Sequence, residues 1–328
     1  MLDKGDVGRE STWAGAGILS PLMPWDYGDA VNALSERGRA LWPELATNLK
    51  HDTGLNPEYW ACGMLVLGKF DQDAAINWCH THRWDYSTVI PVAVARQSAT
   101  EHGLWLPQVA QARNPSVSKA LEAACRKAGV NFLCQTEVAG FDISSGRVTA
   151  VRTLTGRFQA DSYVMCGGAW SQNLLRDTTL SLEIIPVRGQ ILLFKSEPGL
   201  LGHILYRDGQ YLVPRMDGHI LVGSTLEYVD FDKSITDKAR NSLLHFALES
   251  MPDLTKAKLV KQWAGLRPGS PGNVPTISQH PYLENLYINS GHFRYGLTMA
   301  PASAELLVQL MLDRSCHLNT QPYGWNHS

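Results

Sequence analysis

The chain has 328 residues, of which 29 are basic and 31 acidic, and its formal net charge is −2 at pH 7. Charges this evenly balanced give no field for holding nucleic acid or an anionic membrane, so neither is expected as a partner. No segment approaches the roughly 20 apolar residues of a membrane helix, and the N-terminus lacks the basic start and apolar core of a signal peptide. The length predicts two lobes, and we expect a cytoplasmic protein.

In chain order, the first half of the sequence predicts helices that alternate irregularly with short strands. Turn residues such as Gly54, Gly129 and the Ser144-Ser145-Gly146 run separate the segments. The predicted helices cover 27–49, 71–83 and 116–128, the predicted strands cover 63–67 and 130–133, a hairpin covers 137–143 and 148–154, and 89–94 is predicted to be extended.

The second half predicts a different arrangement. A buried strand at 162–166 runs into Gly167-Gly168-Ala169-Trp170-Ser171, a turn of the kind that nucleotide-binding sheets place at the cofactor edge. The fold class predicted from all these elements is α/β (α+β), with an incomplete Rossmann-like lobe interleaved with a lobe built on a mixed or antiparallel sheet. The sheet is predicted from strands at 186–194, 203–206, 211–215 and 219–222, followed by a helix at 237–250 and a return strand at 258–266.

The N-terminus predicts a dinucleotide-binding unit that begins before this sequence does. Asp3 stands where a Rossmann unit ends its second strand with an acid for the adenosine ribose, and the glycine-rich turn of such a unit lies roughly 20 to 30 residues earlier. Gly15-Ala16-Gly17 is no substitute, because Ser20 replaces the third glycine and no strand precedes it. We therefore expect Met1 to be an internal residue of a longer reading frame, which encodes the missing strand and turn upstream.

Two arginines near the C-terminus are the strongest functional signal. Arg267, within Gly265-Leu266-Arg267-Pro268-Gly269, ends the apolar run between Trp263 and Leu266, and Arg294 lies in the glycine-containing turn that opens the apolar segment 297–312. A guanidinium pairs bidentately with a carboxylate, and a helix N-terminus offers N–H groups to a flavin carbonyl or a phosphate. For either arginine alone a solvated side chain is the better interpretation, but the pair favours a site for a small anionic substrate.

Four blocks of sequence resemble one family. Residues 5–24, 167–171, 265–269 and 291–301 are similar to the FAD-dependent amine oxidases of the D-amino-acid oxidase family, and within it to the glycine oxidases of thiamine biosynthesis. The likeness covers nearly the whole chain in the right order and lacks only the N-terminal Gly-x-Gly-x-x-Gly segment. The resemblance implies FAD as cofactor, with an FAD-binding lobe over 1–60, 115–180 and 265–316, a substrate-binding lobe over 61–114 and 181–264, and a polar tail over 317–328.

The resemblance also implies a role for individual residues. Arg267 is implied to bind the substrate carboxylate, assisted by Arg294 and by the hydroxyl of Tyr211. From sequence alone, a sheet tyrosine with an exposed hydroxyl is an equally good interpretation of Tyr211. Asp3 takes the place of a more frequent glutamate and is one methylene shorter. The implied FAD contacts are Asp3 and Lys4 at the ribose; Ser11, Thr12, Ala16, Gly17 and Ile18 at the pyrophosphate and flavin; Val138 at the adenine; and His292, Phe293, Arg294, Tyr295, Gly296, Leu297 and Thr298 around the isoalloxazine ring.

The implied reaction is the oxidation of glycine, or another small amine-bearing acid, to the imine by hydride transfer to flavin N5, with oxygen reduced to hydrogen peroxide. No side-chain base is obligatory for this chemistry if the amine is already neutral. In thiamine biosynthesis the imine feeds the thiazole ring. The alternatives are a D-amino acid or sarcosine oxidase or dehydrogenase, with sarcosine or D-alanine as substrate, and an inactive N-terminally truncated chain. The oligomeric state is left open, with a homo-oligomer among the alternatives.

Other candidate sites receive less weight. His80 and His82 point to different faces of a helix, so no metal is expected. Glu101-His102 has the residue types of a catalytic dyad, but nothing in the sequence orients it. The six cysteines lack CxxC spacing, lie mostly in apolar stretches and are predicted to be reduced core thiols: Cys62, Cys79, Cys125, Cys134, Cys166 and Cys316.

Overall fold

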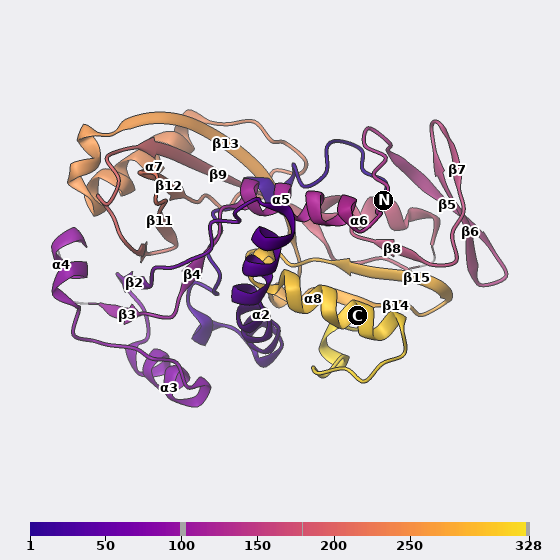
Figure 1. The fold of residues 1–328 in the computed structure, drawn as a ribbon, viewed down its shortest axis with the longest axis horizontal. Coiled ribbons are helices and arrows are strands. Elements are labelled where there is room, and N and C mark those ends of the chain that lie inside the picture. The colour runs from indigo at the N-terminus through magenta and orange to yellow at the C-terminus, as the bar shows by residue number, and fades with distance from the viewer. Residues whose placement is uncertain (99–102, 179, 326–328) are drawn as a thin grey trace.

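A computed structural model describes residues 1–98, 103–178 and 180–325. The architecture is mixed α/β, with a seven-stranded sheet, two three-stranded sheets and a two-stranded pair in these ranges. In Figure 1 the large sheet lies on the left, the three-stranded sheets lie on the right, and α2 (Asp29–Thr53) runs between them. The predicted α/β fold class is confirmed.

The large sheet takes its strands from two separate stretches of sequence. Its order is β13-β9-β12-β11-β10-β2-β3, and each neighbouring pair is antiparallel except β10 and β2. The antiparallel sheet predicted from residues 186–222 is therefore confirmed. The bounds are β2 (Met64–Leu67), β3 (Leu104–Leu106), β9 (Ile185–Lys195), β10 (Ile204–Arg207), β11 (Gln210–Pro214), β12 (His219–Gly223) and β13 (Lys258–Gly269).

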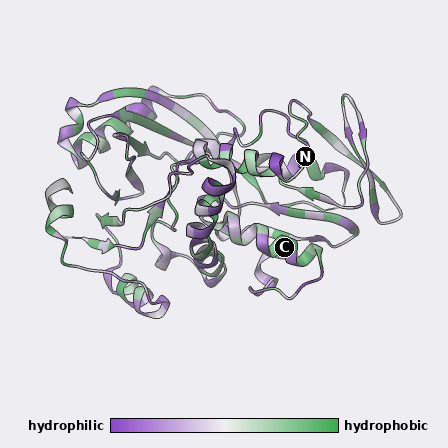
Figure 2. Ribbon diagram, in the orientation of Figure 1, coloured by the Kyte–Doolittle hydropathy of each residue, from purple (hydrophilic) through white to green (hydrophobic). Residues whose placement is uncertain are grey.

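The two faces of this sheet have different partners, because side chains along a strand alternate between faces. On one face Leu192, Leu212 and Val222 pack against the helix α7 (Asp237–Ser250). The opposite face includes Tyr211 and packs toward the centre of the molecule. Figure 2 shows hydrophobic residues along much of the sheet, as a sheet covered on both faces requires.

The second group of strands contains the parallel pair expected of a nucleotide-binding sheet. Strand β15 (Leu283–Ser290) is parallel to β8 (Tyr163–Met165) and antiparallel to β14 (Thr276–His280). β8 leads into a turn of 3-10 helix at Gly168–Trp170, as the sequence predicted. The predicted hairpin is confirmed as β5 (Val138–Ser144) and β6 (Arg147–Thr153), with β7 (Gly156–Phe158) added at its edge.

Two long helices, α2 and α8 (Gly296–Met311), pack against each other near the centre of the molecule (Figure 1). A Cβ on Gly38 would lie 2.1 Å from the carbonyl oxygen of Thr298. Glycine is therefore needed at position 38 for the helices to approach this closely. The Trp42 indole N–H donates to the Leu297 carbonyl at 2.9 Å, which fixes the start of α8 against α2.

The shorter elements complete the fold, and in the described ranges no helix combines the length and hydropathy needed to span a bilayer. α3 and α5 confirm the helices predicted at 71–83 and 116–128 within a few residues. The remaining bounds are α1 (Ser11–Ala14), α3 (Gln72–His82), α4 (Val92–Ser98), α5 (Asn114–Lys127), α6 (Ser171–Leu174), β1 (Trp60–Ala61) and β4 (Ala110–Gln111).

Three local predictions are corrected. The segment predicted to be extended at 89–94 enters α4, because a proline at 91 favours the start of a helix. No strand forms at 130–133, where pairing is confined to a single bridge between Leu2 and Leu133. The segment predicted to be a polar tail carries two buried aromatic residues, Tyr323 and Trp325, and the Tyr323 hydroxyl donates to the carbonyl of Ala30 at 2.6 Å.

Candidate functional site

A cavity of about 840 Å³ opens between the large sheet and the two long helices. Its size lies within the range of small-molecule and cofactor sites, roughly 300–1,000 Å³. Residues of the N-terminal loop, the sheet, the end of β8 and the start of α8 meet there. Among the residues with predicted roles, the lining includes Ser11, Thr12, Ala16, Gly17, Ile18, Tyr211, Arg267, His292, Phe293, Arg294, Tyr295, Gly296 and Leu297.

Four residues with predicted FAD contacts lie outside this lining. Asp3 accepts a hydrogen bond from the Gly5 N–H at 2.9 Å, and Lys4 Nζ lies 3.2 Å from the ring centroid of Trp170. Val138 begins β5, and Thr298 is buried, with its hydroxyl donating to the Ile18 carbonyl at 3.2 Å. The dyad considered at Glu101-His102 falls outside the described residues.

Arg267 sits on the cavity face of the sheet with its guanidinium held by main-chain and hydroxyl oxygens. Its Nη1 donates to the Thr225 carbonyl at 3.2 Å and its Nη2 to the Ser224 hydroxyl at 2.7 Å. Burial lowers the pKa of Arg267, and an interaction with the Tyr211 side chain opposes part of this shift. Among the described residues Arg267 forms no ion pair with a carboxylate, so its charge is available to an anion in the cavity.

Arg294 reaches the same cavity from the turn before α8. Its main-chain N–H donates to Asn273 Oδ1 at 3.1 Å, which fixes the turn. Burial acts to lower the pKa of Arg294, but the charge effects of four nearby tyrosines outweigh it and raise that pKa. Two of these tyrosines, Tyr27 and Tyr295, share a 2.6 Å hydrogen bond between their hydroxyls. The structure thus brings Arg267, Arg294 and Tyr211 together at one cavity, as the sequence suggested.

The loop that lines the cavity from the N-terminal side is fixed by a residue that the sequence did not single out. Arg215 is 5% exposed, and its Nη2 donates to the Ala16 carbonyl at 2.8 Å. Burial lowers the pKa of Arg215 to about 10. Gly17 has φ +82°, and a Cβ there would lie 1.9 Å from the carbonyl oxygen of Ala112. An arginine directly after a largely apolar strand was the sequence signal for this anchor.

The start of α8 supplies hydrogen-bond donors to the cavity. Gly296 and Leu297 line it, and no side chain of the described residues caps the N-terminus of this 16-residue helix. Burial lowers the pKa of His292 to about 4, so its ring is uncharged at neutral pH, and its Nε2 lies 2.9 Å from the Ser303 hydroxyl. Free helical N–H groups of this kind match the carbonyls of an isoalloxazine ring.

Two asparagines provide acceptors on the same cavity. Asn114 Oδ1 and Asn289 Oδ1 are buried without a hydrogen-bond partner among the described residues, and both side chains line the cavity. Buried polar atoms of this kind ordinarily have a partner. Together with the size of the cavity, these donors and acceptors fit a large polar aromatic cofactor. Sequence reasoning missed both asparagines, since neither belongs to a motif.

The cysteines only partly match the prediction of core thiols. All six are free, and Cys79 is buried, but Cys166 is exposed where it lines the cavity. Neighbouring protein groups nevertheless desolvate this thiol and raise its pKa to about 11. In the described ranges no three His, Cys, Asp or Glu side chains are grouped to hold a metal ion.

Comparison with known families decides the assignment. The family described as FAD dependent oxidoreductase (DAO) matches residues 1–310 of the chain. The chain belongs to this family. The resemblance seen in the sequence blocks is therefore confirmed, and the cavity belongs to an FAD-dependent oxidoreductase.

Relatives of this FAD-dependent oxidoreductase include named glycine oxidases. Glycine oxidase of Pseudomonas aeruginosa is 39% identical over 331 residues, which cover 99% of this chain and 91% of the relative. The bifunctional protein ThiO/ThiG of Trichormus variabilis is 31% identical over 94% of this chain and 48% of the relative.

Solved structures show the same fold. The crystal structure of glycine oxidase from Geobacillus kaustophilus superposes on the oxidoreductase with a TM-score of 0.94, at 24% identity, and covers 100% of this chain and 91% of the other. Iminodiacetate oxidase from Chelativorans sp. BNC1 superposes with a TM-score of 0.87 at 20% identity, over 98% of this chain and 91% of the other.

Proposed function

We propose that this enzyme oxidises glycine, or another amino acid of similar size, to its imine, with oxygen reduced to hydrogen peroxide. The observation that carries the proposal is Arg267, a partly buried guanidinium without a carboxylate partner among the described residues, on the wall of a cavity that fits FAD. The 39% identity to the glycine oxidase of Pseudomonas aeruginosa supports glycine as the substrate.

In this proposal Arg267 binds the substrate carboxylate, with Arg294 and the Tyr211 hydroxyl assisting. FAD, when bound, supplies the hydride acceptor at its N5 atom. The side chains orient the substrate so that its α-carbon faces the ring, and this orientation is their main contribution to rate. His292 is uncharged at neutral pH and no side-chain base is assigned, so the amine has to lose its proton before the reaction.

The residues proposed to hold FAD surround the cavity from several elements. Loop residues from Ser11 to Ile18 are proposed at the pyrophosphate and flavin, and the start of α8 at the isoalloxazine ring. We keep Asp3, Lys4 and Val138 as proposed contacts of the adenosine half, although they lie outside the cavity lining. We likewise propose the division into two lobes, an FAD-binding lobe (1–60, 115–180, 265–316) and a substrate-binding lobe (61–114, 181–264). It is supported by the large sheet, whose strands β9 to β12 all lie within the second lobe.

The use of the imine product in a later reaction stays a prediction. Relatives named ThiO/ThiG support delivery of the imine to thiamine thiazole synthesis. A cytoplasmic location and the oligomeric state also stay predictions.

The test is reduction of the bound flavin. Protein loaded with FAD is freed of excess cofactor and mixed with glycine without air, and we expect the yellow colour to bleach. Admitting air should restore the colour and produce equal amounts of hydrogen peroxide, glyoxylate and ammonia, because the imine takes up water. Parallel assays with sarcosine and D-alanine rank the alternative substrates. Flavin that stays oxidised with all three amines would refute the proposal.

A further inference from the structure

Residues 224–236 link β12 to α7, the helix on the face of the large sheet opposite the cavity. The start of this segment lies next to Arg267. Two oxygens of this segment, the Ser224 hydroxyl and the Thr225 carbonyl, accept the hydrogen bonds from the guanidinium. A guanidinium has five N–H donors in a fixed plane. These two acceptors therefore set the direction of that plane, the Tyr211 side chain contributes a further interaction, and the remaining donors face a ligand in the cavity.

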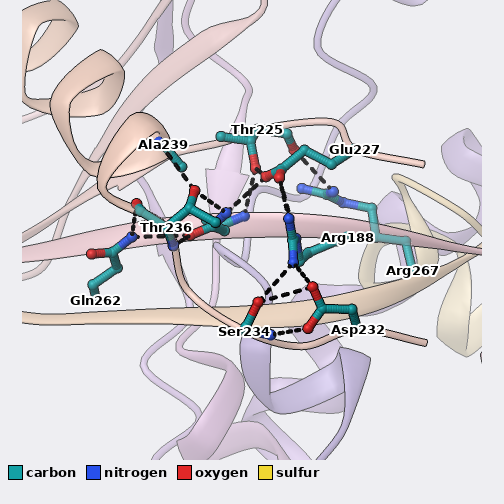
Figure 3. Close-up of polar contacts among 10 residues, drawn as sticks. Arg188, Thr225, Glu227, Asp232, Ser234, Thr236, Ala239, Gln262 and Arg267 are labelled. Carbon is teal, nitrogen blue, oxygen red and sulfur yellow. Dashed lines mark hydrogen bonds and ion pairs between the residues drawn. The ribbon is translucent and has the colours of Figure 1, made fainter. Parts of the chain in front are cut away.

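Thr225 is held in turn by its own side chain. Its hydroxyl donates to Glu227 Oε1 and accepts a hydrogen bond from the Gln190 N–H at 2.9 Å. The Gln190 side chain also donates to Glu227 Oε1, at 2.9 Å. Figure 3 shows Thr225 joined by dashed lines to both the Arg267 guanidinium and the Glu227 carboxylate. With its hydroxyl fixed, Thr225 can present its carbonyl to Arg267 in only a narrow range of orientations.

Arg188 holds Glu227 in place and balances its charge. The buried Arg188 guanidinium donates to Glu227 Oε2 at 2.6 Å and 3.2 Å, and to Asp232 Oδ2 at 2.5 Å. The main chains of Arg188 and Glu227 exchange hydrogen bonds of 2.9 Å and 3.0 Å as well. Burial acts to raise the pKa of Glu227, but hydrogen bonds from Thr225 and Arg188 outweigh it and lower that pKa. Glu227 therefore stays ionised and is matched to a cation of its own.

The charge balance between Arg188 and Glu227 affects which partner Arg267 can bind in the cavity. A carboxylate two residues from the Arg267 contact could compete with a substrate for that guanidinium. Because Arg188 and Gln190 take up the Glu227 oxygens, Arg267 keeps its unpaired charge for the ligand. We propose that Thr225, Glu227 and Arg188 are positioning residues, which orient Arg267 for the substrate carboxylate through the Thr225 carbonyl. This inference rests on the proposed function in assigning the carboxylate to Arg267.

The sharpest variant is Thr225→Val, which removes the hydroxyl, keeps the shape and leaves the carbonyl in the chain. The FAD-loaded enzyme should show a KM for glycine raised about tenfold with kcat nearly unchanged, because carboxylate binding is weakened equally in the ground and transition states. The Kd of acetate, measured by calorimetry, should rise by the same factor. Glu227→Gln, which keeps the shape but removes the charge, should raise both constants by roughly threefold.

Thr236→Val is the matched control. Thr236 belongs to the same network, since Gln190 Nε2 donates to its hydroxyl at 3.1 Å, but its hydroxyl caps α7, and its hydrogen bonds among the described residues do not include the Ser224–Thr225 segment. Its replacement should lower Tm while KM and the acetate Kd stay at wild-type values. Equal rises in KM for Thr225→Val and Thr236→Val would show a general loosening of the sheet and overturn the inference.

The acetate measurement separates this inference from the proposed function. Wild-type constants in folded Thr225→Val and Glu227→Gln would overturn the inference even if glycine is the substrate. If the wild-type enzyme does not oxidise glycine but binds acetate with a Kd that rises in Arg267→Ala and Thr225→Val, glycine oxidation fails and the positioning network stands.

Discussion

Gly189 and Arg267 lie against each other on neighbouring strands, β9 and β13, and a Cβ on Gly189 would be 2.1 Å from Arg267 Nη1. The guanidinium thus lies flat on a strand that has no side chain at that point. Gly223 has the same relationship to Tyr211, whose hydroxyl oxygen would lie 2.7 Å from an added Cβ. The proposed carboxylate site is therefore shaped by two glycines as much as by the groups proposed to bind.

Gly189→Ala should displace the guanidinium and weaken substrate binding. The new methyl group overlaps the terminal nitrogen, which has to move by about 1 Å to reach an ordinary contact distance, and we expect KM for glycine to rise at least tenfold. Steady-state kinetics and the acetate Kd provide the measurement. Gly28→Ala is the control, because no atom of the described part of the chain lies within 4 Å of a Cβ at Gly28. A wild-type KM in Gly189→Ala would mean that the guanidinium position is unimportant.

Arg267→Ala should cost far more binding than the loss of a surface arginine. Removing a buried charge-assisted pair with a carboxylate costs roughly 3 kcal/mol, which is about a hundredfold in KM. Arg147→Ala is the comparison, since Arg147 pairs with Glu284 at 2.8 Å on the exposed hairpin and its loss should leave KM unchanged. If both variants keep the wild-type KM, the carboxylate does not bind at Arg267.

Acid should destabilise the fold through two histidines that the protein desolvates. Burial lowers the pKa of His292 to about 4 and that of His203 to about 4, from ordinary values near 6.5. Between pH 6.5 and 4 each histidine binds a proton in the unfolded chain but not in the folded one, so stability falls as the pH falls, by up to about 1.4 kcal/mol per pH unit for each group. Urea unfolding at pH 7 and pH 5 measures this slope.

His292→Gln should flatten that slope, since glutamine can still hydrogen-bond Ser303 and does not titrate. The double variant with His203→Gln should flatten it further. An acid slope identical to wild type in both variants would show that these histidines are protonated in the folded protein.

Cys166 reports occupancy of the cavity without any measurement of activity. With a pKa of about 11, only about one thiol in a thousand is ionised at pH 8, so iodoacetamide should alkylate it slowly. Bound FAD should slow the reaction further by covering the cavity. Cys316, which lies outside the cavity lining, should react at the same rate with and without FAD. Equal Cys166 rates in the two states would place the cofactor elsewhere.

The sequence by itself determined much of the local structure. Alternating apolar residues and turn signals between 186 and 222 predicted four strands of the large sheet, and the helix predicted at 237–250 has the bounds of α7. These elements depend on contacts between residues close in sequence, which short-range patterns record. The presence of Arg267 and Arg294 at one site was also visible, because Arg267 follows an apolar run and Arg294 lies in a recognisable glycine-containing turn.

Only the tertiary structure decided how the site is supported. Arg215 reaches the Ala16 carbonyl from 199 positions away, and Arg188 meets Glu227 from 39 positions away, on a segment without a motif. Which acceptor a buried guanidinium meets depends on strand register and on where glycines leave room, and no local pattern encodes either. The amino-acid sequence fixed which side chains carry a positive charge, and the packing of distant strands fixed where each guanidinium points.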